Sequence, residues 1–80
     1  MPKLPAVEGS RFIKFLEAFG FKILRTKGSH TRLIADDGRM TTVPIHNGKI
    51  LPKGLLRKII REDLELDFDE FMSLWEKHFK

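Results

Sequence analysis

The residue whose surroundings best suggest catalytic chemistry is His30, which directly follows Gly28 and Ser29. Its neighbours Lys27 and Arg32 are basic, and polar flanks of this kind indicate an exposed imidazole rather than a core histidine. Neighbouring cations favour the neutral imidazole, the form that accepts a proton as a general base near pH 7. On spacing alone, a surface histidine without a catalytic role fits the same residues.

Other groups that could do chemistry are sparse. The remaining histidines are His46, two residues after Pro44, and His78 in the last segment, for which we expect no role. The three histidines are too widely spaced to predict a metal site, and the chain has no cysteine to act as a nucleophile or thiolate ligand. No glycine-rich phosphate loop precedes a helix. We therefore expect no metal and no cofactor.

Acidic residues gather near the end of the sequence, where Asp67, Asp69 and Glu70 lie close together. They occupy the first turn of an expected helix, a position in which capping and the helix dipole favour carboxylates, so we interpret them as structural. Asp67 and Glu70 also have the spacing of a capping box. Apolar residues follow at helical spacing and predict an acidic C-terminal helix over residues 67–79.

Two earlier segments carry the spacing of amphipathic helices. From residue 10, apolar side chains recur at i, i+3, i+4 and i+7 as far as Phe19, and Gly20 can end the helix in a left-handed conformation. A second helix opens between Pro52 and Gly54. Its apolar side consists of Leu55, Leu56, Ile59 and Ile60, and its basic side of Lys53, Arg57, Lys58 and Arg61.

Three short strands are expected between these helices, at residues 21–27, 30–35 and 39–45. Asp37-Gly38 predicts a two-residue turn between the second strand and the third. That turn pairs His30 with Ile45 and Arg32 with Val43, and it places Val43 on the same face as His30.

These elements predict one α+β domain over residues 1–80, with residues 1–9 as an extended lead-in and no internal repeat. A three-stranded antiparallel sheet covered on one face by helices buries all the apolar stripes. No apolar run approaches the length of about 20 residues needed to cross a bilayer, and no signal-peptide pattern is present. We expect a cytoplasmic protein with no membrane contact.

The charge is divided unevenly along the chain. Residues 1–61 hold thirteen basic and four acidic side chains, a formal charge of +9, whereas residues 62–80 hold two basic and seven acidic side chains, a charge of −5. A strongly basic body on so few residues is typical of a nucleic-acid-binding protein, although solvated lysines on an ordinary basic protein fit as well.

Taken together, four segments resemble the HicA family of bacterial and archaeal toxins, the mRNA-interferase halves of toxin–antitoxin pairs. The resemblance extends from about Gly9 to Phe71 in the order and spacing of the family. The four segments are Gly20-Phe21, Lys27-Gly28-Ser29-His30, Val43-Pro44-Ile45-His46 and Lys53-Gly54-Leu55-Leu56-Arg57-Lys58-Ile59-Ile60.

This resemblance implies a fold like that of the double-stranded-RNA-binding domain, of order α-β-β-β-α, with an extra C-terminal helix here. It implies that His30 is essential, that the activity is ribosome-independent cleavage of mRNA, and that a HicB-type antitoxin neutralises the protein. The chain departs from the family pattern in its long acidic final helix and in residues 62–66, which replace a turn of small residues.

An RNase of this kind would use the 2′-OH of the RNA as nucleophile, with His30 as the base. In this hypothesis Lys27, Arg32 and Arg39 hold the phosphates. Gly28 lets the RNA backbone approach closely, and the Ser29 hydroxyl bonds a phosphate oxygen. His46 is a candidate for a second acid–base group.

Two other functions fit parts of the sequence. A non-catalytic RNA-binding module could use the same basic face, whereas a helix-turn-helix DNA reader is disfavoured because the last helix is acidic. The acidic helix either adds core to a thin domain or provides a surface that turns RNA away and docks the antitoxin.

Overall fold

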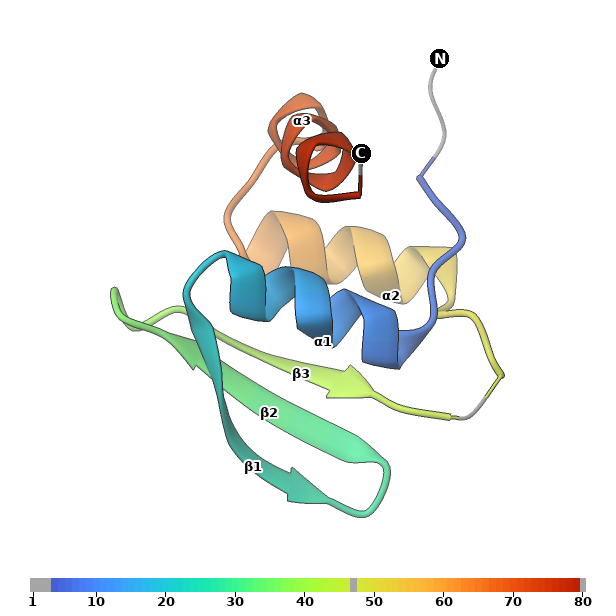
Figure 1. Cartoon of the computed structure of the whole chain (residues 1–80), viewed down its shortest axis with the longest axis vertical. Helices are drawn as coiled ribbons and strands as arrows, with labels where there is room; N and C mark the ends of the chain where they lie inside the picture. Colours follow the sequence, from blue (N-terminus) through green and yellow to red (C-terminus); the bar gives the residue numbers. More distant parts are fainter. Residues whose placement is uncertain (1–3, 47, 80) are drawn as a thin grey trace.

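The computed structural model describes residues 4–46 and 48–79, in which helices cover one face of an antiparallel sheet (Figure 1). The elements are α1 (Gly9–Ala18), β1 (Phe21–Lys27), β2 (His30–Ala35), β3 (Met40–Pro44), α2 (Lys53–Lys58), the π-helical turn η1 (Ile59–Asp63) and α3 (Phe68–His78). The sheet has three strands in the order β1-β2-β3. The expected α+β fold, with its additional C-terminal helix, is confirmed.

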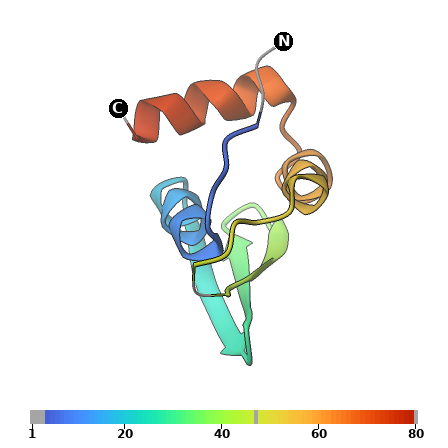
Figure 2. The same ribbon diagram turned by 90° about the vertical axis from the view of Figure 1, so that its right-hand side faces the viewer.

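The helices cover the sheet in two layers (Figure 2). In the first layer, α1 and the continuous α2–η1 segment contact the strands. In the second layer, α3 crosses over these helices on the side away from the sheet. Both helical layers and the sheet contribute side chains with 0% exposure: Phe12 of α1, Leu33 of β2, Val43 of β3, Leu56 of α2 and Phe71 of α3. Each layer therefore contributes to a single core, in which every such side chain stabilises the fold by about 1.5–3 kcal/mol.

The hairpin between β2 and β3 differs from the expected one by a single residue. Its loop has three residues, Asp36 to Gly38, because the Gly38 N–H donates to the Ala35 carbonyl (3.0 Å) and the Ala35 N–H donates to the Arg39 carbonyl (2.8 Å). Gly38 has a φ of 93°, as the last residue of such a loop requires. The predicted two-residue turn at Asp37-Gly38 is therefore wrong.

The longer loop shifts the pairing of β3 with β2. His30 pairs with Pro44 and Arg32 with Thr42, in each case one residue earlier in β3 than expected. Because successive residues of a strand point to opposite faces, a shift of one residue reverses both faces of the strand. Val43 therefore lies in the core and not beside His30, and Thr42 takes its place on the uncovered face.

The second helix leaves α-helical geometry at Ile59, a change that the sequence pattern did not indicate. The Leu64 N–H donates to the Ile59 carbonyl five residues earlier (2.9 Å), which closes a π-helical turn. Two hydrogen bonds tie this turn to the hairpin. The Thr41 hydroxyl donates to Asp63 Oδ2 (2.8 Å), and the Arg39 guanidinium donates to the Leu64 carbonyl (2.6 Å).

The C-terminal helix begins with the predicted capping box. The Glu70 N–H donates to Asp67 Oδ1 (2.8 Å), and the Asp67 N–H donates to Glu70 Oε1 (3.1 Å), which confirms the structural interpretation of these acids. Phe71 packs among aromatic rings of α1 and α3, with ring-centre distances of 5.4 Å to Phe15 and 5.7 Å to Trp75. α3 is thus built into the core, although its outer side is acidic.

The lead-in is extended, as expected, and two of its side chains are buried. Leu4 and Val7 belong to the core, and the Leu51 N–H donates to the Val7 carbonyl (2.8 Å). Residues 1–3 of the expected lead-in, and Asn47 of the loop before α2, lie outside the described residues. Within the described ranges, every helix is too short or too polar to cross a membrane.

Candidate functional site

The turn between β1 and β2 fixes the position of His30. Lys27 pairs with His30, so the loop between them consists of Gly28 and Ser29 alone. Gly28 has a φ of 59°, and a positive φ at the first of two loop residues is typical of the type II′ hairpin, whose twist matches the strands. His30 is consequently the first residue of β2, at the end of the sheet, and its side chain is exposed.

The end of β3 lies directly against this turn. The Ile45 N–H donates to the Ser29 carbonyl (2.6 Å), and Pro44 is the pairing partner of His30. α1 starts at the same place, since a Cβ atom on Gly9 would collide with the Pro44 carbonyl oxygen. The segments 27–30 and 43–46 are therefore neighbours in space, and the backbone on either side of His30 is held by hydrogen bonds.

A basic surface surrounds His30 on the face of the sheet that the helices leave uncovered. Lys27 lies opposite His30 and Arg25 lies opposite Arg32, as the two-residue turn requires, and beyond them Leu24 is an extra residue in a β-bulge. Lys22 follows on the same face at the other end of β1. We call the set Lys22, Arg25, Lys27, His30 and Arg32 the open basic face, and all five side chains are exposed.

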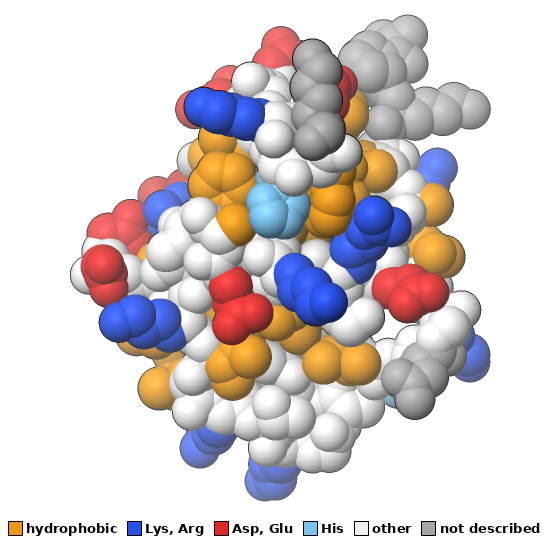
Figure 3. Space-filling model, in the orientation of Figure 1, with side chains coloured by type: hydrophobic (Ala, Val, Ile, Leu, Met, Phe, Trp, Pro, Cys, Tyr) orange, Lys and Arg blue, Asp and Glu red, His pale blue; other side chains and the backbone are white. Residues whose placement is uncertain are grey.

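The two ends of the molecule differ in charge. On the face shown in Figure 3, basic side chains project from the lower end, where β1 and β2 lie, and acidic side chains gather at the top near α3, while the region between them carries both kinds. Sequence reasoning did not single out Lys22 and Arg25: simple alternation in a strand puts Arg25 on the face of Lys27, but it separates Lys22 from Arg25. Only the bulge at Leu24 brings the two to one face.

Arg39 lies at the opposite end of the sheet from His30. Its Nε donates to Asp37 Oδ2 (2.8 Å), and its guanidinium carbon lies 5.5 Å from the centre of the Phe21 ring. Hydrogen bonds from the Arg39 backbone and side chain hold the pKa of Asp37 below its usual value. The structure thus brings together five of the residues predicted from sequence: Lys27, Gly28, Ser29, His30 and Arg32. Arg39 lies apart from them, at the turn between β2 and β3.

His46 is exposed two residues beyond Pro44, in the loop that leads to α2. The paired position of Pro44 puts this loop at the same end of the sheet as His30. His78 is far from both in the fold. It is the last residue of α3, and its ring lies against Phe15 of α1 and against Phe79, with ring-centre distances of 5.9 and 4.5 Å.

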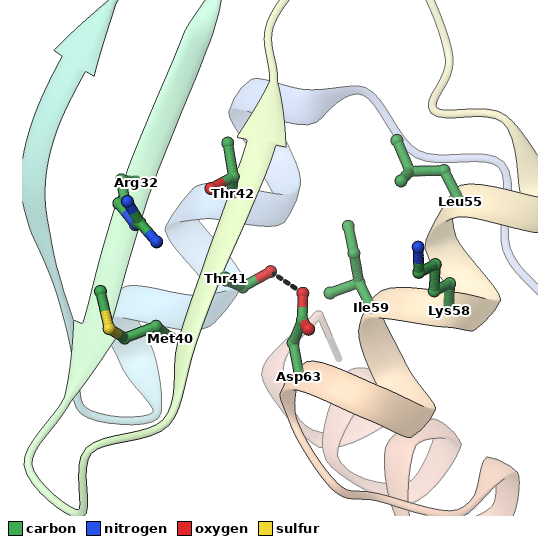
Figure 4. A pocket seen from close by; sticks show the side chains of 8 residues that line it. All are labelled: Arg32, Met40, Thr41, Thr42, Leu55, Lys58, Ile59 and Asp63. Carbon is green, nitrogen blue, oxygen red and sulfur yellow. Dashed lines mark hydrogen bonds between the residues drawn. The ribbon is translucent and has the colours of Figure 1, made fainter.

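A second group of cations lies on the α2–η1 segment, which carries the exposed side chains Lys53, Arg57, Lys58 and Arg61. A groove between β3 and the α2–η1 segment joins this helix to the open basic face, since Arg32 and Lys58 both line it (Figure 4). Such a surface can bind a chain of phosphates while an imidazole accepts a proton from a neighbouring group. In residues 4–46 and 48–79 no three potential metal ligands cluster together.

Comparison with protein families gives a match over most of the chain. The family model described as "HicA toxin of bacterial toxin-antitoxin" matches residues 9–64, more than two thirds of the chain. The matched segment runs from the first residue of α1 to the residue that follows η1, so it contains the open basic face and excludes α3. No curated protein matches the chain.

Proposed function

Because the chain belongs to the HicA family of toxins of bacterial toxin–antitoxin systems, we propose that it is an endoribonuclease that cleaves mRNA independently of the ribosome, with His30 as the general base. In this proposal a HicB-type antitoxin neutralises the toxin by covering the face that carries His30, and both act in the cytoplasm. The role of toxin and the existence of an antitoxin partner follow from the family itself.

The observation that carries the proposal is the position of His30 among the cations of the open basic face. Lys27 lies directly opposite His30, and Arg32 follows two residues along the same strand face. Lys and Arg side chains supply most of the affinity of proteins for nucleic-acid phosphates. A phosphodiester bound by these two side chains lies beside the exposed imidazole of His30, which can accept the proton of the neighbouring ribose 2′-OH.

The chemistry requires few groups. His30 removes the proton from a ribose 2′-OH, and the 2′-oxygen attacks the adjacent phosphorus. Lys27 and Arg32 stabilise the negative charge of the pentacoordinate phosphorane. The bond to the 5′-oxygen then breaks, an acid protonates that oxygen, and the products are a 2′,3′-cyclic phosphate and a 5′-OH.

His46 is our candidate for the acid, since its loop leaves the sheet at the same end as His30. A pH–rate profile with one ionisation instead of two would contradict this assignment.

Gly28 and Ser29 serve the bound strand in a different way. No atom lies within 4 Å of where a Gly28 Cβ would be, so a phosphate can approach the turn, where the Ser29 hydroxyl can donate to it.

The alternative function is a non-catalytic RNA-binding module that uses the same open basic face. The two functions differ in a single assay on toxin purified free of antitoxin. Cleavage of a labelled RNA supports the endoribonuclease, whereas RNA affinity without any cleavage supports the binding module.

Arg32 and Arg39 provide a matched pair of substitutions. Arg32→Gln is expected to weaken RNA binding. Loss of one phosphate contact should lower the slope of log K against log salt concentration by about one. The free energy of unfolding should change by no more than about 0.5 kcal/mol. Arg39→Gln is expected to cost about 1–3 kcal/mol of stability, because the Leu64 carbonyl loses its donor. RNA affinity should be unchanged in the Arg39 variant.

Both variants are measured by urea unfolding and by RNA titration in a His30→Ala background, which prevents cleavage during the titration. A loss of RNA affinity in Arg39→Gln equal to that in Arg32→Gln would show that Arg39 holds phosphates as the sequence suggested.

A further inference from the structure

The groove between β3 and the α2–η1 segment has walls of mixed chemistry. Figure 4 shows Met40 and Thr42 on its strand side, Leu55 on its helix side and Asp63 at one end. Its volume is about 270 Å³. Pockets for drug-sized ligands run from roughly 300 to 1,000 Å³, so this groove suits a smaller group, such as a single flat ring system.

We infer that this groove is a nucleobase subsite, which takes one base of the RNA strand and prefers a base that carries an exocyclic amino group. The inference rests on the proposed function, because it extends the substrate bound at His30. The occupant is a base of single-stranded RNA, since the open basic face and the basic side of α2 meet at this groove and together suit a strand of phosphates.

Cations stand on both sides of the groove. Arg32 reaches it from β2 and Lys58 from α2 (Figure 4). Both side chains are exposed, and each can bind one of the phosphates that flank a nucleotide. Met40 and Leu55 supply apolar surface against which the flat face of a base can pack. Met40 is 36% exposed and Leu55 is half-buried, as the wall of an open groove must be.

Asp63 supplies the group that distinguishes one base from another. Its Oδ2 accepts the hydrogen bond from Thr41, which fixes the carboxylate, while Oδ1 accepts none from the side chains that the structure describes. Carboxylates accept hydrogen bonds from the amino groups of bases, as with the N4 amino group of cytosine. The helical spacing also marks Asp63 as unusual, because it places this charged residue on the apolar stripe of Leu56, Ile59 and Ile60.

Uracil is the base that this carboxylate disfavours. The one Watson–Crick donor of uracil lies between two carbonyl oxygens, and an anionic oxygen repels both of them. Cytosine, adenine and guanine each present an amino group at the edge of the ring and can donate to Asp63 Oδ1.

The groove lies close enough to His30 to influence where the RNA is cut. Arg32 is two residues from His30 on the same strand face, a distance of about 7 Å. Adjacent nucleotides of an extended strand span such a distance. Asp63 lies farther along, since its partner Thr41 pairs with Leu33, about 10 Å from His30 along β2. The base in the groove therefore belongs to a nucleotide within one or two positions of the cleaved bond, and Asp63 sets the base preference at that one position.

The test is the sequence preference of cleavage on an RNA library with randomised positions, read by sequencing the cut ends. The wild-type protein should favour amino-bearing bases over uracil at least about fivefold at one position near the cut. Asp63→Asn should abolish or reverse this preference, because the amide oxygen keeps the Thr41 bond and the NH₂ group faces the groove as a donor. Glu62→Gln removes a neighbouring exposed carboxylate outside the groove and should leave the preference unchanged.

Cleavage by Asp63→Asn with the wild-type base preference would overturn the inference and leave the proposed function intact. Absence of cleavage by the wild-type protein would overturn the proposed function. The subsite is then judged by the affinities for cytosine and uracil oligonucleotides, whose ratio must differ between wild type and Asp63→Asn. If Asp63→Asn fails to fold, Met40→Trp fills the groove from an exposed position, and an unchanged preference in that variant would overturn the inference.

Discussion

Replacement of His30 by alanine is expected to remove RNA cleavage while the fold stays intact. A general base contributes a factor of about 10² to 10⁴ to the rate, so the variant should be at least about a hundredfold slower than wild type. His30 is exposed at the first residue of β2, and its side chain takes no part in the core. The expected change in the free energy of unfolding is therefore within about 0.5 kcal/mol. The measurement is the cleavage rate of a labelled RNA, together with urea unfolding of the same preparation.

His78→Ala is the control for this experiment. It also removes an exposed imidazole, but its ring lies 5.9 Å from the Phe15 ring and 4.5 Å from the Phe79 ring, far from the open basic face. The His78 variant should lose some stability and keep the wild-type cleavage rate, which is the opposite of the result expected for His30. A folded His30→Ala protein that cleaves RNA at the wild-type rate would contradict the assignment of the base.

Phe71→Ala is expected to produce the largest loss of stability of any single change considered for this chain. The Phe71 ring is 0% exposed and packs on Phe12, Phe15 and Trp75, with ring-centre distances of 6.3, 5.4 and 5.7 Å. Truncation of a buried phenylalanine costs about 3–5 kcal/mol, partly through the cavity that remains. Native domains have a total stability of about 5–15 kcal/mol, so this one substitution should remove between a fifth and nearly all of the stability of the fold, measured as a lower midpoint of urea unfolding.

The same variant decides what the acidic C-terminal helix does. Urea unfolding of Phe71→Ala is compared with that of Glu76→Gln, an exposed acid on the outer side of α3 whose replacement should change stability by no more than about 0.5 kcal/mol. A large loss for Phe71→Ala alone means that α3 completes the core. Unchanged stability with weakened antitoxin binding in either variant would instead assign α3 to the antitoxin interface.

The helices and strands could be predicted from sequence because their signals are local. The apolar spacing around Phe12 and Phe15 and the capping box at Asp67 each depend on a few consecutive residues, and the structure has these elements within one or two residues of the expected ends. The family match ends at residue 64, yet Phe71 lies in the same core as α1. The stripe of aromatic residues in the last segment was the only sequence signal for this packing.

The features that sequence did not reveal depend on contacts between distant residues. Asp37-Gly38 fits both a two-residue and a three-residue loop. The longer loop agrees with the burial of Val43 against the helices and with the bond from Arg39 to the Leu64 carbonyl. The π-helical turn at Ile59 is likewise accompanied by the bond between Thr41 and Asp63, residues that are 22 positions apart.

The candidate site was predictable to the extent that it is contiguous in the chain. Lys27, His30 and Arg32 surround one tight turn, so their proximity follows from the hairpin alone. Arg25 follows from Lys27 by simple alternation, whereas Lys22 joins them only through the bulge at Leu24, and bulges have no reliable local signal. Arg39 could not be separated from the other cations by sequence, because its partners Asp37 and Leu64 were identified only in the folded chain.

The central claim, that His30 activates the 2′-OH of the RNA, is tested most directly by the chemistry of the cut ends. Toxin free of antitoxin is incubated with a short RNA, and with the same RNA carrying a single 2′-deoxy nucleotide at the cleaved position. We predict 2′,3′-cyclic phosphate and 5′-OH ends from the all-ribose RNA and no cut at the 2′-deoxy position. Cleavage at the 2′-deoxy nucleotide, or products that end in 5′-phosphate and 3′-OH, would contradict the claim.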